Sequence, residues 1–388
     1  MKILFLLTIG LDRHETSEHL LTAIIEQLCI NGHSVHIIQK KTGGDLDPIP
    51  PKLSGYEITT DTIPFSPPSK NKFLSRYIVD IKYLLECKKR IKQEYDAVFI
   101  QSNKTMGLAV KLIKGKLPGA RITINVQDIF PYNAFYVGKI KNKLLFHLLA
   151  SEERYGYKHC DQIITISEDM KETLVQDGVD PEKIHVIYNW SYNDQVYKIP
   201  EKKEILDLFD PDYFNVVYAG NIGVMQNVNI VIEAAGLLKD EKDIWFHVIG
   251  NGLYKEKLIR RAKELGIDRI SFWPMQPPEQ ACKIYSSADI NLIPLAENIY
   301  KTALPSKTAT CFACQKPIIF ATGAEGEFAK RVRKETGCVF VDSNDPDQLK
   351  NSIIEVKNHK VKCDTSEFFQ KYMSISQNSN LYSQIIQG

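Results

Sequence analysis

The segment that most constrains the fold is residues 216–223, which read VVYAGNIG. An apolar, β-branched run breaks here at two closely spaced glycines and leads into a helical pattern, which is typical of phosphate-binding turns in parallel sheets. The same order recurs downstream, where FHVIG ends at residues 250–252 and LPSK opens a helical run before KPIIFATG. We therefore expect several loops to meet at the carboxyl ends of parallel strands, where open α/β sheets bind ligands.

Both halves of the chain alternate short apolar runs with longer helical patterns. Strands are predicted in the first half at 3–8, 34–39, 97–101, 121–128 and 163–167, and in the second half at 215–220, 244–250, 270–275, 290–295, 317–321 and 338–342. Such alternation implies βαβ units, and 388 residues exceed one ordinary core. The predicted class is α/β, with two Rossmann-like, doubly wound parallel-sheet domains facing a cleft.

A polar stretch over residues 192–211 predicts the connection between the domains, because it contains Pro200 and the charged run EKKE. We place the first domain at residues 1–195 and the second at 196–365. The tail, residues 366–388, has an amphipathic pattern and is predicted as a helix that packs back toward the N-terminal domain.

The bulk composition excludes several classes of protein. With 49 basic and 47 acidic residues, no overall charge favours nucleic acid as a partner. The eight cysteines follow no regular spacing, which fits a reduced, cytoplasmic location. Cys311 and Cys314 form a lone C-x-x-C pair, and buried helix positions explain them better than zinc or redox chemistry. No apolar run reaches the roughly 20 residues of a membrane-spanning helix.

An ordered set of segments resembles bacterial glycosyltransferases of family 4, which have the GT-B fold. The set comprises RITINVQDIFP, DQIITISEDMKETL, YAGNIG, FHVIGNG, SADINLIPL, LPSK and KPIIF. The resemblance points to the branch that builds capsule and O-antigen polysaccharides. It implies transfer of a sugar from a nucleotide donor, a UDP-sugar in most members, with retention and without a metal or other cofactor. The donor would bind the second domain, and a polyprenyl-diphosphate-linked glycan acceptor the first.

Two glycine-containing loops are the predicted donor site. Glycines let backbone N–H groups approach an anion closely, so we place the diphosphate on the first loop and the nucleoside against the second. The alternative is a pair of tight turns that bind nothing. The candidate residues of these loops are Gly220, Asn221, Gly223, Gly250, Asn251 and Gly252.

Lys307 is the cation expected to bind the donor phosphate. It follows Pro305 and Ser306 at a predicted helix start, where the side chain and the helix dipole both favour an anion. The alternative is an exposed helix lysine, and Lys301 is a weaker candidate for the same role.

The chain departs from the family pattern at four positions. Family members often carry arginine and lysine where this chain has Asn221 and Gln226, and a pair of glutamates where it has Thr302 and Thr310. The second glutamate normally binds the ribose hydroxyls. We assign that contact to Thr310, whose hydroxyl replaces it only in part.

Asp128 is the predicted catalytic residue of the first domain. It follows the apolar strand RITINV, and its position resembles one where family members hold an acidic residue or histidine beside the reacting sugars. It could orient the acceptor hydroxyl or stabilise an oxocarbenium-like centre. The alternative is an aspartate that caps the following turn. Thr8 and Gly10, after the first strand, should line the cleft from the same side.

Three D-x-D triplets, at 45–47, 210–212 and 345–347, are discounted as metal sites because none ends an apolar strand and aspartates cap helices and turns. Two basic segments instead suggest an anionic membrane surface. One is an amphipathic helix that begins at Lys70 and ends at Lys92, and the other contains Lys139, Lys141 and Lys143. A core helix with a solvated lysine face is the alternative. We expect a cytoplasmic protein, peripheral at the inner face of the cell membrane.

Two other functions remain compatible with the sequence. A nucleotide-sugar 2-epimerase shares the fold and would act on the donor without an acceptor. A non-catalytic nucleotide-sugar-binding assembly protein would fit the missing glutamates, and it would bind the nucleotide without turnover.

Overall fold

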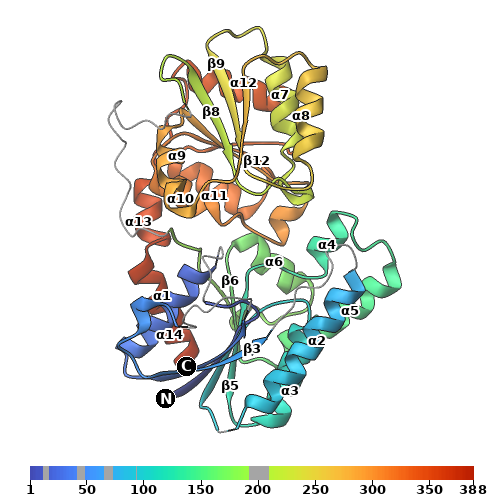
Figure 1. The fold of residues 1–388 in the computed structure, drawn as a ribbon, viewed down its shortest axis with the longest axis vertical. Coiled ribbons are helices and arrows are strands. Elements are labelled where there is room, and N and C mark those ends of the chain that lie inside the picture. Colours follow the sequence, from blue (N-terminus) through green and yellow to red (C-terminus); the bar gives the residue numbers. More distant parts are fainter. Residues whose placement is uncertain (12–16, 42–48, 65–72, 93, 192–208) are drawn as a thin grey trace. The chain divides into compact units, whose positions relative to one another are not determined.

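The computed structural model describes residues 1–11, 17–41, 49–64, 73–92, 94–191 and 209–388. The chain forms two compact units (Figure 1). The first unit comprises Met1–Asn189 and Ile375–Gly388, and the second comprises Trp190–Ser374. The boundary predicted at residues 195 and 196 lies outside the described residues.

The first unit is built on a seven-stranded sheet in the order β3-β2-β1-β4-β5-β6-β7. All of its neighbouring strands pair in parallel. The strand order reverses between β1 and β4, so the carboxyl ends of these two strands flank the topological switch point, where such sheets form a crevice. The strands are β1 (Lys2–Leu6), β2 (Ser34–Lys41), β3 (Ile58–Pro64), β4 (Ala97–Gln101), β5 (Arg121–Val126), β6 (Gln162–Thr165) and β7 (Ile184–Val186).

Helices cover both faces of this sheet, with α1 and α14 on one side and α2, α3 and α5 on the other (Figure 1). Because both faces are covered, the central strands are continuous apolar runs, and all five residues of β4 are buried. The helices are α1 (Glu18–Ile30), α2 (Phe73–Arg90), α3 (Met106–Lys116), α4 (Tyr132–Tyr136), α5 (Lys143–His159), α6 (Glu168–Gln176) and α14 (Ile375–Gln387).

The second unit has a six-stranded sheet in the order β10-β9-β8-β11-β12-β13, again with parallel pairs throughout. Its switch point lies between β8 and β11. The strands are β8 (Phe214–Ala219), β9 (Ile244–Ile249), β10 (Ile270–Trp273), β11 (Ile290–Pro294), β12 (Ile318–Ala321) and β13 (Val339–Val341). The helices are α7 (Asn229–Leu237), α8 (Lys255–Glu264), α9 (Ala281–Ser287), α10 (Lys307–Ala313), α11 (Glu327–Thr336), α12 (Pro346–Lys357) and α13 (Ser366–Tyr372).

The prediction of two Rossmann-like parallel-sheet domains is confirmed. The strands β3 and β7 were not predicted, and both lie at the ends of the first sheet. Six of the seven residues of β3 are exposed or only partly buried, and β7 has three residues. Edge strands lack the continuous apolar run that reveals central strands.

The tail contains two helices, which belong to different units. The helix α13 belongs to the second unit. Just before it, the Thr365 hydroxyl donates to the carbonyl of Phe312 at 2.6 Å. The last helix, α14, packs into the first unit, and its Tyr382 hydroxyl donates to Asn125 Oδ1 on β5 at 3.0 Å. The tail was predicted as one helix over 366–388, and the structure divides it at residues 373–374. No helix in the described part of the chain is both long and apolar enough to cross a membrane.

Candidate active site

In the second unit, the loops after β8 and β9 are held against each other at the carboxyl edge of the sheet. The Gly220 N–H donates to the carbonyl of Ile249 at 2.9 Å, and the Ile222 N–H donates to the carbonyl of Asn251 at 2.9 Å. The loop after β11 joins them, because the Ala296 N–H donates to the carbonyl of Met225 at 2.8 Å. The structure therefore brings together the two glycine-containing loops that the sequence predicted.

Gly250 is required by this close approach of the two loops. A Cβ atom at this position would lie 1.8 Å from the carbonyl oxygen of Gly220, and the backbone φ is +147°. Side chains are excluded both by the contact and by the conformation. Asn251 and Gly252 follow in the same loop and are exposed.

Lys307 places its ammonium directly beneath the Gly220 loop. Its Nζ donates to the carbonyl of Ala219 at 2.7 Å and lies 3.8 Å from the ring centroid of Tyr218. A Cβ atom added to Gly220 would meet this Nζ at 2.9 Å. The predicted cation and the predicted phosphate loop therefore share one site, although they come from α10 and β8.

Among the residues that the structure describes, no carboxylate compensates the charge of Lys307. Burial lowers the pKa of this ammonium from 10.5 to about 8, and the groups that shift it include no carboxylate. The ring face of Tyr218 attracts the cation, but it carries no full charge. An anion that entered the loop would restore the charged form of the lysine.

Two tyrosines that sequence reasoning missed support this lysine. The Tyr218 hydroxyl donates to the carbonyl of Asn221, and the Tyr285 hydroxyl donates to the carbonyl of Ala219 at 3.1 Å. Both side chains are buried. Tyr218 lies within the VVYAGNIG run, so its position was visible in the sequence, but its place under the ammonium was not.

The threonines at the two glutamate positions make local contacts. The Thr302 hydroxyl is fully buried and donates to the carbonyl of Ile299 at 3.0 Å. Thr310 is also buried, and its hydroxyl accepts from the Ser191 hydroxyl at 3.3 Å. Thr310 lies one turn beyond Lys307 on α10. Pro305 and Ser306 precede this helix, and the Ser306 side chain forms no capping hydrogen bond.

Asn221 and Gln226, which replace the basic residues of the family pattern, contact each other. The Asn221 Nδ2 donates to Gln226 Oε1 at 3.5 Å, and a Cβ atom at Gly223 would meet that Oε1 at 2.8 Å. Neutral side chains therefore form the outer rim of the loop, and Lys307 supplies the positive charge from below.

Asp128 follows β5 in the first unit, and its side chain is exposed. Desolvation raises the pKa of its carboxyl to about 6, against a hydrogen bond from Asn133 that lowers it. Protein atoms surround the carboxyl without covering it. Thr8 is partly exposed in the loop after β1, whereas Gly10 in the same loop is buried.

The described residues contain no group of three or more histidine, cysteine or acidic side chains placed to hold a metal ion. Two D-x-D triplets cap local structure, since Asp345 Oδ1 accepts from the Gln348 N–H at 2.9 Å and Asp210 Oδ1 accepts from the Asp212 N–H at 3.0 Å. The triplet at 45–47 lies outside the described residues. Cys311 and Cys314 are free, buried thiols.

Two doubly wound units follow one another along the chain, and the second places a lysine beneath a glycine-containing loop at its switch point. Family models match both halves of the chain. Residues 17–190 match Glycosyltransferase Family 4, and residues 199–374 match Glycosyl transferases group 1. The chain belongs to the family 4 glycosyltransferases, and it is a sugar-transferring enzyme with the GT-B fold.

Individual relatives agree with this assignment. The chain is 25% identical over 320 residues to a probable glycosyltransferase, WbjE of Pseudomonas aeruginosa, covering 79% of this chain and 78% of that protein. It is 30% identical to WcaI of Escherichia coli K12, named as a putative colanic acid biosynthesis glycosyl transferase, over 51% of this chain and 50% of that protein. The fold is similar to that of HepE from Anabaena, solved with UDP and glucose, with a TM-score of 0.70 and 14% identity over 99% and 98% of the two chains.

Proposed function

We propose that the enzyme moves a sugar from a UDP-sugar to a lipid-linked glycan during synthesis of a bacterial surface polysaccharide. The observation that carries the donor assignment is the Lys307 ammonium, which lies partly buried beneath the Gly220 loop and has no carboxylate partner among the residues that the structure describes. A diphosphate supplies the missing negative charge, and the glycines admit it to the backbone N–H groups. The solved relative HepE holds UDP, and the names of WbjE and WcaI support a role in sugar transfer.

In this proposal Lys307 neutralises the departing diphosphate in place of a divalent cation, so transfer is independent of metal. The anomeric configuration is retained, and the departing phosphate oxygen takes the proton of the acceptor hydroxyl as the new glycosidic bond forms. Asp128 orients that hydroxyl. With a carboxyl pKa of about 6, it is mostly ionised at neutral pH and accepts a hydrogen bond.

Thermal unfolding with UDP, GDP, CMP or TDP, each with and without EDTA, tests the donor assignment. A nucleotide at about 100 times its dissociation constant adds about 2.7 kcal/mol of stability. We expect this gain with UDP alone, undiminished by EDTA and lost in Lys307→Met. The matched control is Lys301→Met, which removes the lysine of the neighbouring loop and should leave the gain intact.

Several outcomes would contradict the proposal. Stabilisation by one of the other nucleotides alone would mean that the donor carries that nucleotide and not UDP. Loss of the stabilisation by UDP in EDTA would mean that donor binding requires a metal ion. Binding of UDP without sugar transfer to any lipid-linked acceptor would favour the epimerase or the non-catalytic binding protein. Full turnover by a folded Asp128→Ala variant would remove that residue from the mechanism.

The start of α5 supports a membrane surface as the location of the acceptor. Leu144 and Leu148 are 81% and 68% exposed, one turn apart on this helix. Lys139, Lys141 and Lys143 precede or begin the helix and are exposed. Exposed leucines beside lysines suit the interface of an anionic bilayer. On α2 the buried Tyr83, Leu84 and Cys87 mark a core-facing side, and Lys70 lies outside the described residues.

Flotation with phosphatidylglycerol vesicles and with neutral vesicles tests this location. We expect the wild-type protein to float only with the anionic vesicles. A variant with both Leu144→Ser and Leu148→Ser should float with neither kind of vesicle. Leu253→Ser changes a leucine of the second unit that is still more exposed, at 95%, and serves as the control. Equal flotation of all three proteins would contradict a role for α5.

A further inference from the structure

Two cysteines of the second unit lie side by side, although they are 25 positions apart in the sequence. Cys338 Sγ is 3.2 Å from Cys363 Sγ, and both thiols are free. Cys338 immediately precedes β13, and Cys363 lies in the segment that joins α12 to α13. We call these two residues the cysteine pair. Its sulfur atoms are in contact, so a small change of side-chain torsion brings them within bonding distance.

Backbone contacts hold the two segments of the cysteine pair together. The Asp364 N–H donates to the carbonyl of Thr336 at 2.8 Å, and the Cys338 N–H donates to the Thr336 hydroxyl at 3.1 Å. Gly337 permits this close approach, because a Cβ atom there would lie 2.2 Å from the carbonyl oxygen of Lys362, and its φ is +72°. A disulfide bond forms without backbone movement only where two cysteines are already held close together, and these contacts hold the cysteine pair in that manner.

The two thiols of the pair differ in reactivity. Cys338 is 1% exposed, and burial raises the pKa of its thiol well above the ordinary value. Cys363 is partly exposed, and hydrogen bonds from Cys338 and from the backbone of Ile318 lower the pKa of its thiol, although desolvation opposes them. The thiolate is the reactive form of cysteine. Cys363 is therefore the thiol that an oxidant attacks first, and Cys338 is the neighbour that closes the bond.

Among the residues that the structure describes, the other cysteines lack this combination of exposure and acidity. Cys29 is partly exposed, but burial raises the pKa of its thiol to about 11. The remaining cysteines are buried, and they are Cys87, Cys160, Cys282, Cys311 and Cys314. Oxidation of the folded protein should therefore be selective for the cysteine pair.

We propose that the cysteine pair is a reversible oxidation site, for which a low-molecular-weight disulfide such as oxidised glutathione is the oxidant. The Cys363 thiolate attacks one sulfur of the oxidant, so that a mixed disulfide forms at Cys363 and one thiolate leaves. Cys338 then loses its proton and attacks the Cys363 sulfur, which forms the bond between the two cysteines and releases the second thiolate. The protein loses two electrons and two protons, and the oxidant becomes two thiols.

The bond fastens the segment before α13 to the sheet of the second unit. The same segment contacts α10, since the Thr365 hydroxyl donates to the carbonyl of Phe312 at 2.6 Å. A disulfide that closes a loop of 25 residues restricts the unfolded chain, so oxidation should stabilise the second unit. This inference is independent of the proposed function, because it involves no residue assigned to the donor or to the acceptor.

Peptide mapping of the folded protein after exposure to oxidised glutathione tests the site. We expect one cross-linked pair of peptides, containing Cys338 and Cys363, and a loss of two free thiols per chain that dithiothreitol reverses. Cys338→Ala should stop at the mixed disulfide on Cys363, whereas Cys363→Ser should keep all of its remaining thiols. The matched control is Cys29→Ser, which removes the other partly exposed cysteine and should leave the cross-link unchanged.

Urea unfolding followed by tryptophan fluorescence, which reports the second unit, tests the effect of the bond. Oxidation should raise the midpoint of the wild type by about 1 M and should not raise that of Cys338→Ala. A wild-type protein without the cross-link, or with glutathione on Cys29 in place of Cys363, would overturn the oxidation site. A cross-link without a rise in the midpoint would overturn its stabilising effect. The peptide map is made on the wild type, so its result does not depend on how the variants fold.

Discussion

Lys40 in the first unit and Lys307 in the second occupy similar places. Each ammonium lies over a tyrosine ring, at 4.9 Å from Tyr83 and 3.8 Å from Tyr218. Each tyrosine hydroxyl donates to a backbone carbonyl in the loop after the strand at the switch point, at Leu7 or at Asn221. The two sheets thus present the same local arrangement at the edge where parallel sheets bind ligands.

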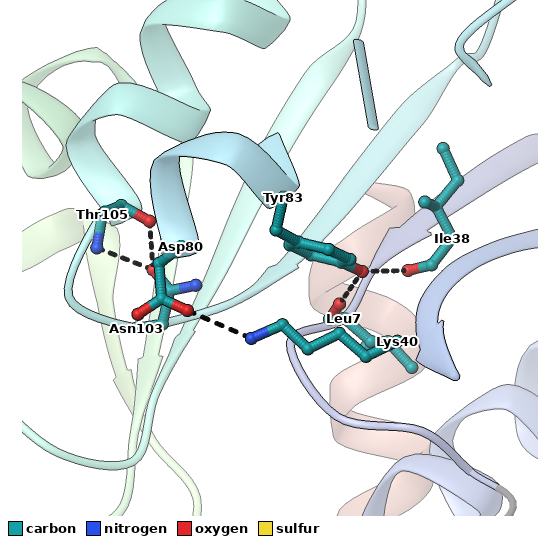
Figure 2. A network of polar contacts seen from close by, with 7 residues as sticks. All are labelled: Leu7, Ile38, Lys40, Asp80, Tyr83, Asn103 and Thr105. Atoms are coloured by element: carbon teal, nitrogen blue, oxygen red, sulfur yellow. Dashed lines mark hydrogen bonds and ion pairs between the residues drawn. The ribbon is translucent and has the colours of Figure 1, made fainter. Parts of the chain in front are cut away.

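The two lysines differ in their partners. Lys40 is paired with Asp80 at 3.1 Å (Figure 2), whereas no carboxylate in the described part of the chain pairs with Lys307. A paired buried lysine holds structure together, and removal of its partner is costly. A desolvated lysine without a partner is stabilised when an anion arrives. The comparison separates a cation that maintains the fold from one that is suited to bind a ligand.

Removal of Asp80 should have the largest effect on stability. Asp80→Asn leaves the Lys40 charge buried without its partner, which costs about 3 to 5 kcal/mol. All three tryptophans, at 190, 245 and 273, lie in the second unit, so their fluorescence reports that unit while far-UV circular dichroism reports both. Urea unfolding should show the loss in circular dichroism and leave the fluorescence midpoint in place.

The control for this variant is Asp61→Asn, which weakens a pair with His36 at 3.2 Å in which the aspartate is 41% exposed. Exposed pairs contribute about 1 kcal/mol or less. Combining Lys40→Met with Asp80→Leu should recover most of the lost stability. A cost below about 1 kcal/mol for Asp80→Asn would erase the distinction between the two lysines.

Lys307→Met should weaken UDP binding and strengthen the fold. Loss of a charge-assisted contact of about 1.5 to 3 kcal/mol lowers the affinity by about 10- to 100-fold. Because the pKa is lowered from 10.5 to about 8, removal of the desolvated ammonium should raise the free energy of unfolding at pH 7 by up to about 3 kcal/mol. Tryptophan fluorescence in urea and calorimetry with UDP measure the two effects. A loss of stability would mean that Lys307 is a structural cation like Lys40.

The pH dependence of UDP binding follows from the same ammonium. Since its pKa is about 8 in the folded protein, the lysine loses its proton as the pH rises from 7 to 9.5, and the affinity for UDP should fall. Binding at pH 8.5 should take up a proton from the buffer, measurable by calorimetry in buffers of different ionisation enthalpy. Lys307→Arg should bind UDP with a flat profile over this range, and a sloping profile in that variant would implicate another group.

The stability of the second unit should change in the opposite direction. Between pH 8 and 10.5 the unfolded lysine holds more protons than the folded one. The free energy of unfolding therefore rises with pH in this window, and the gain is lost as the pH falls through 8. The difference between wild type and Lys307→Met, followed by tryptophan fluorescence, isolates this contribution. An identical pH dependence in both proteins would contradict the lowered pKa.

The smallest effects are expected from the two tyrosines, where the same substitution can be compared in both units. Tyr83→Phe and Tyr218→Phe each keep the ring under the ammonium and remove a hydroxyl that donates to a loop carbonyl, at a cost of about 1 kcal/mol. Only Tyr218→Phe should weaken UDP binding, by a few-fold, because Asn221 belongs to the donor loop. A similar loss of UDP affinity in Tyr83→Phe would show that the two sites do not act separately.

Much of the fold was predictable because its central strands are buried on both faces. Runs such as AVFIQ and INLIP read directly as strands. The strand β3 escaped prediction because only Ile63 among its seven residues is fully buried. The tail pattern indicated helix, but the division into α13 and α14 depends on which unit each segment contacts.

The donor loop was predictable from glycines at strand ends, and Lys307 from its place at a helix start. The Lys40–Asp80 pair was not, because its two side chains come from β2 and α2, far apart in sequence. The contact of Thr310 with Ser191 was hidden in the same way.

The sequence by itself determined the alternation of strands and helices, the two glycine loops and the family, because these depend on local patterns of burial and backbone freedom. Only the tertiary structure decided which lysine has a carboxylate partner. Pairing depends on distances of a few ångströms between side chains 40 residues or more apart, such as Lys40 and Asp80. Such distances follow from strand order and helix packing, which no local pattern encodes.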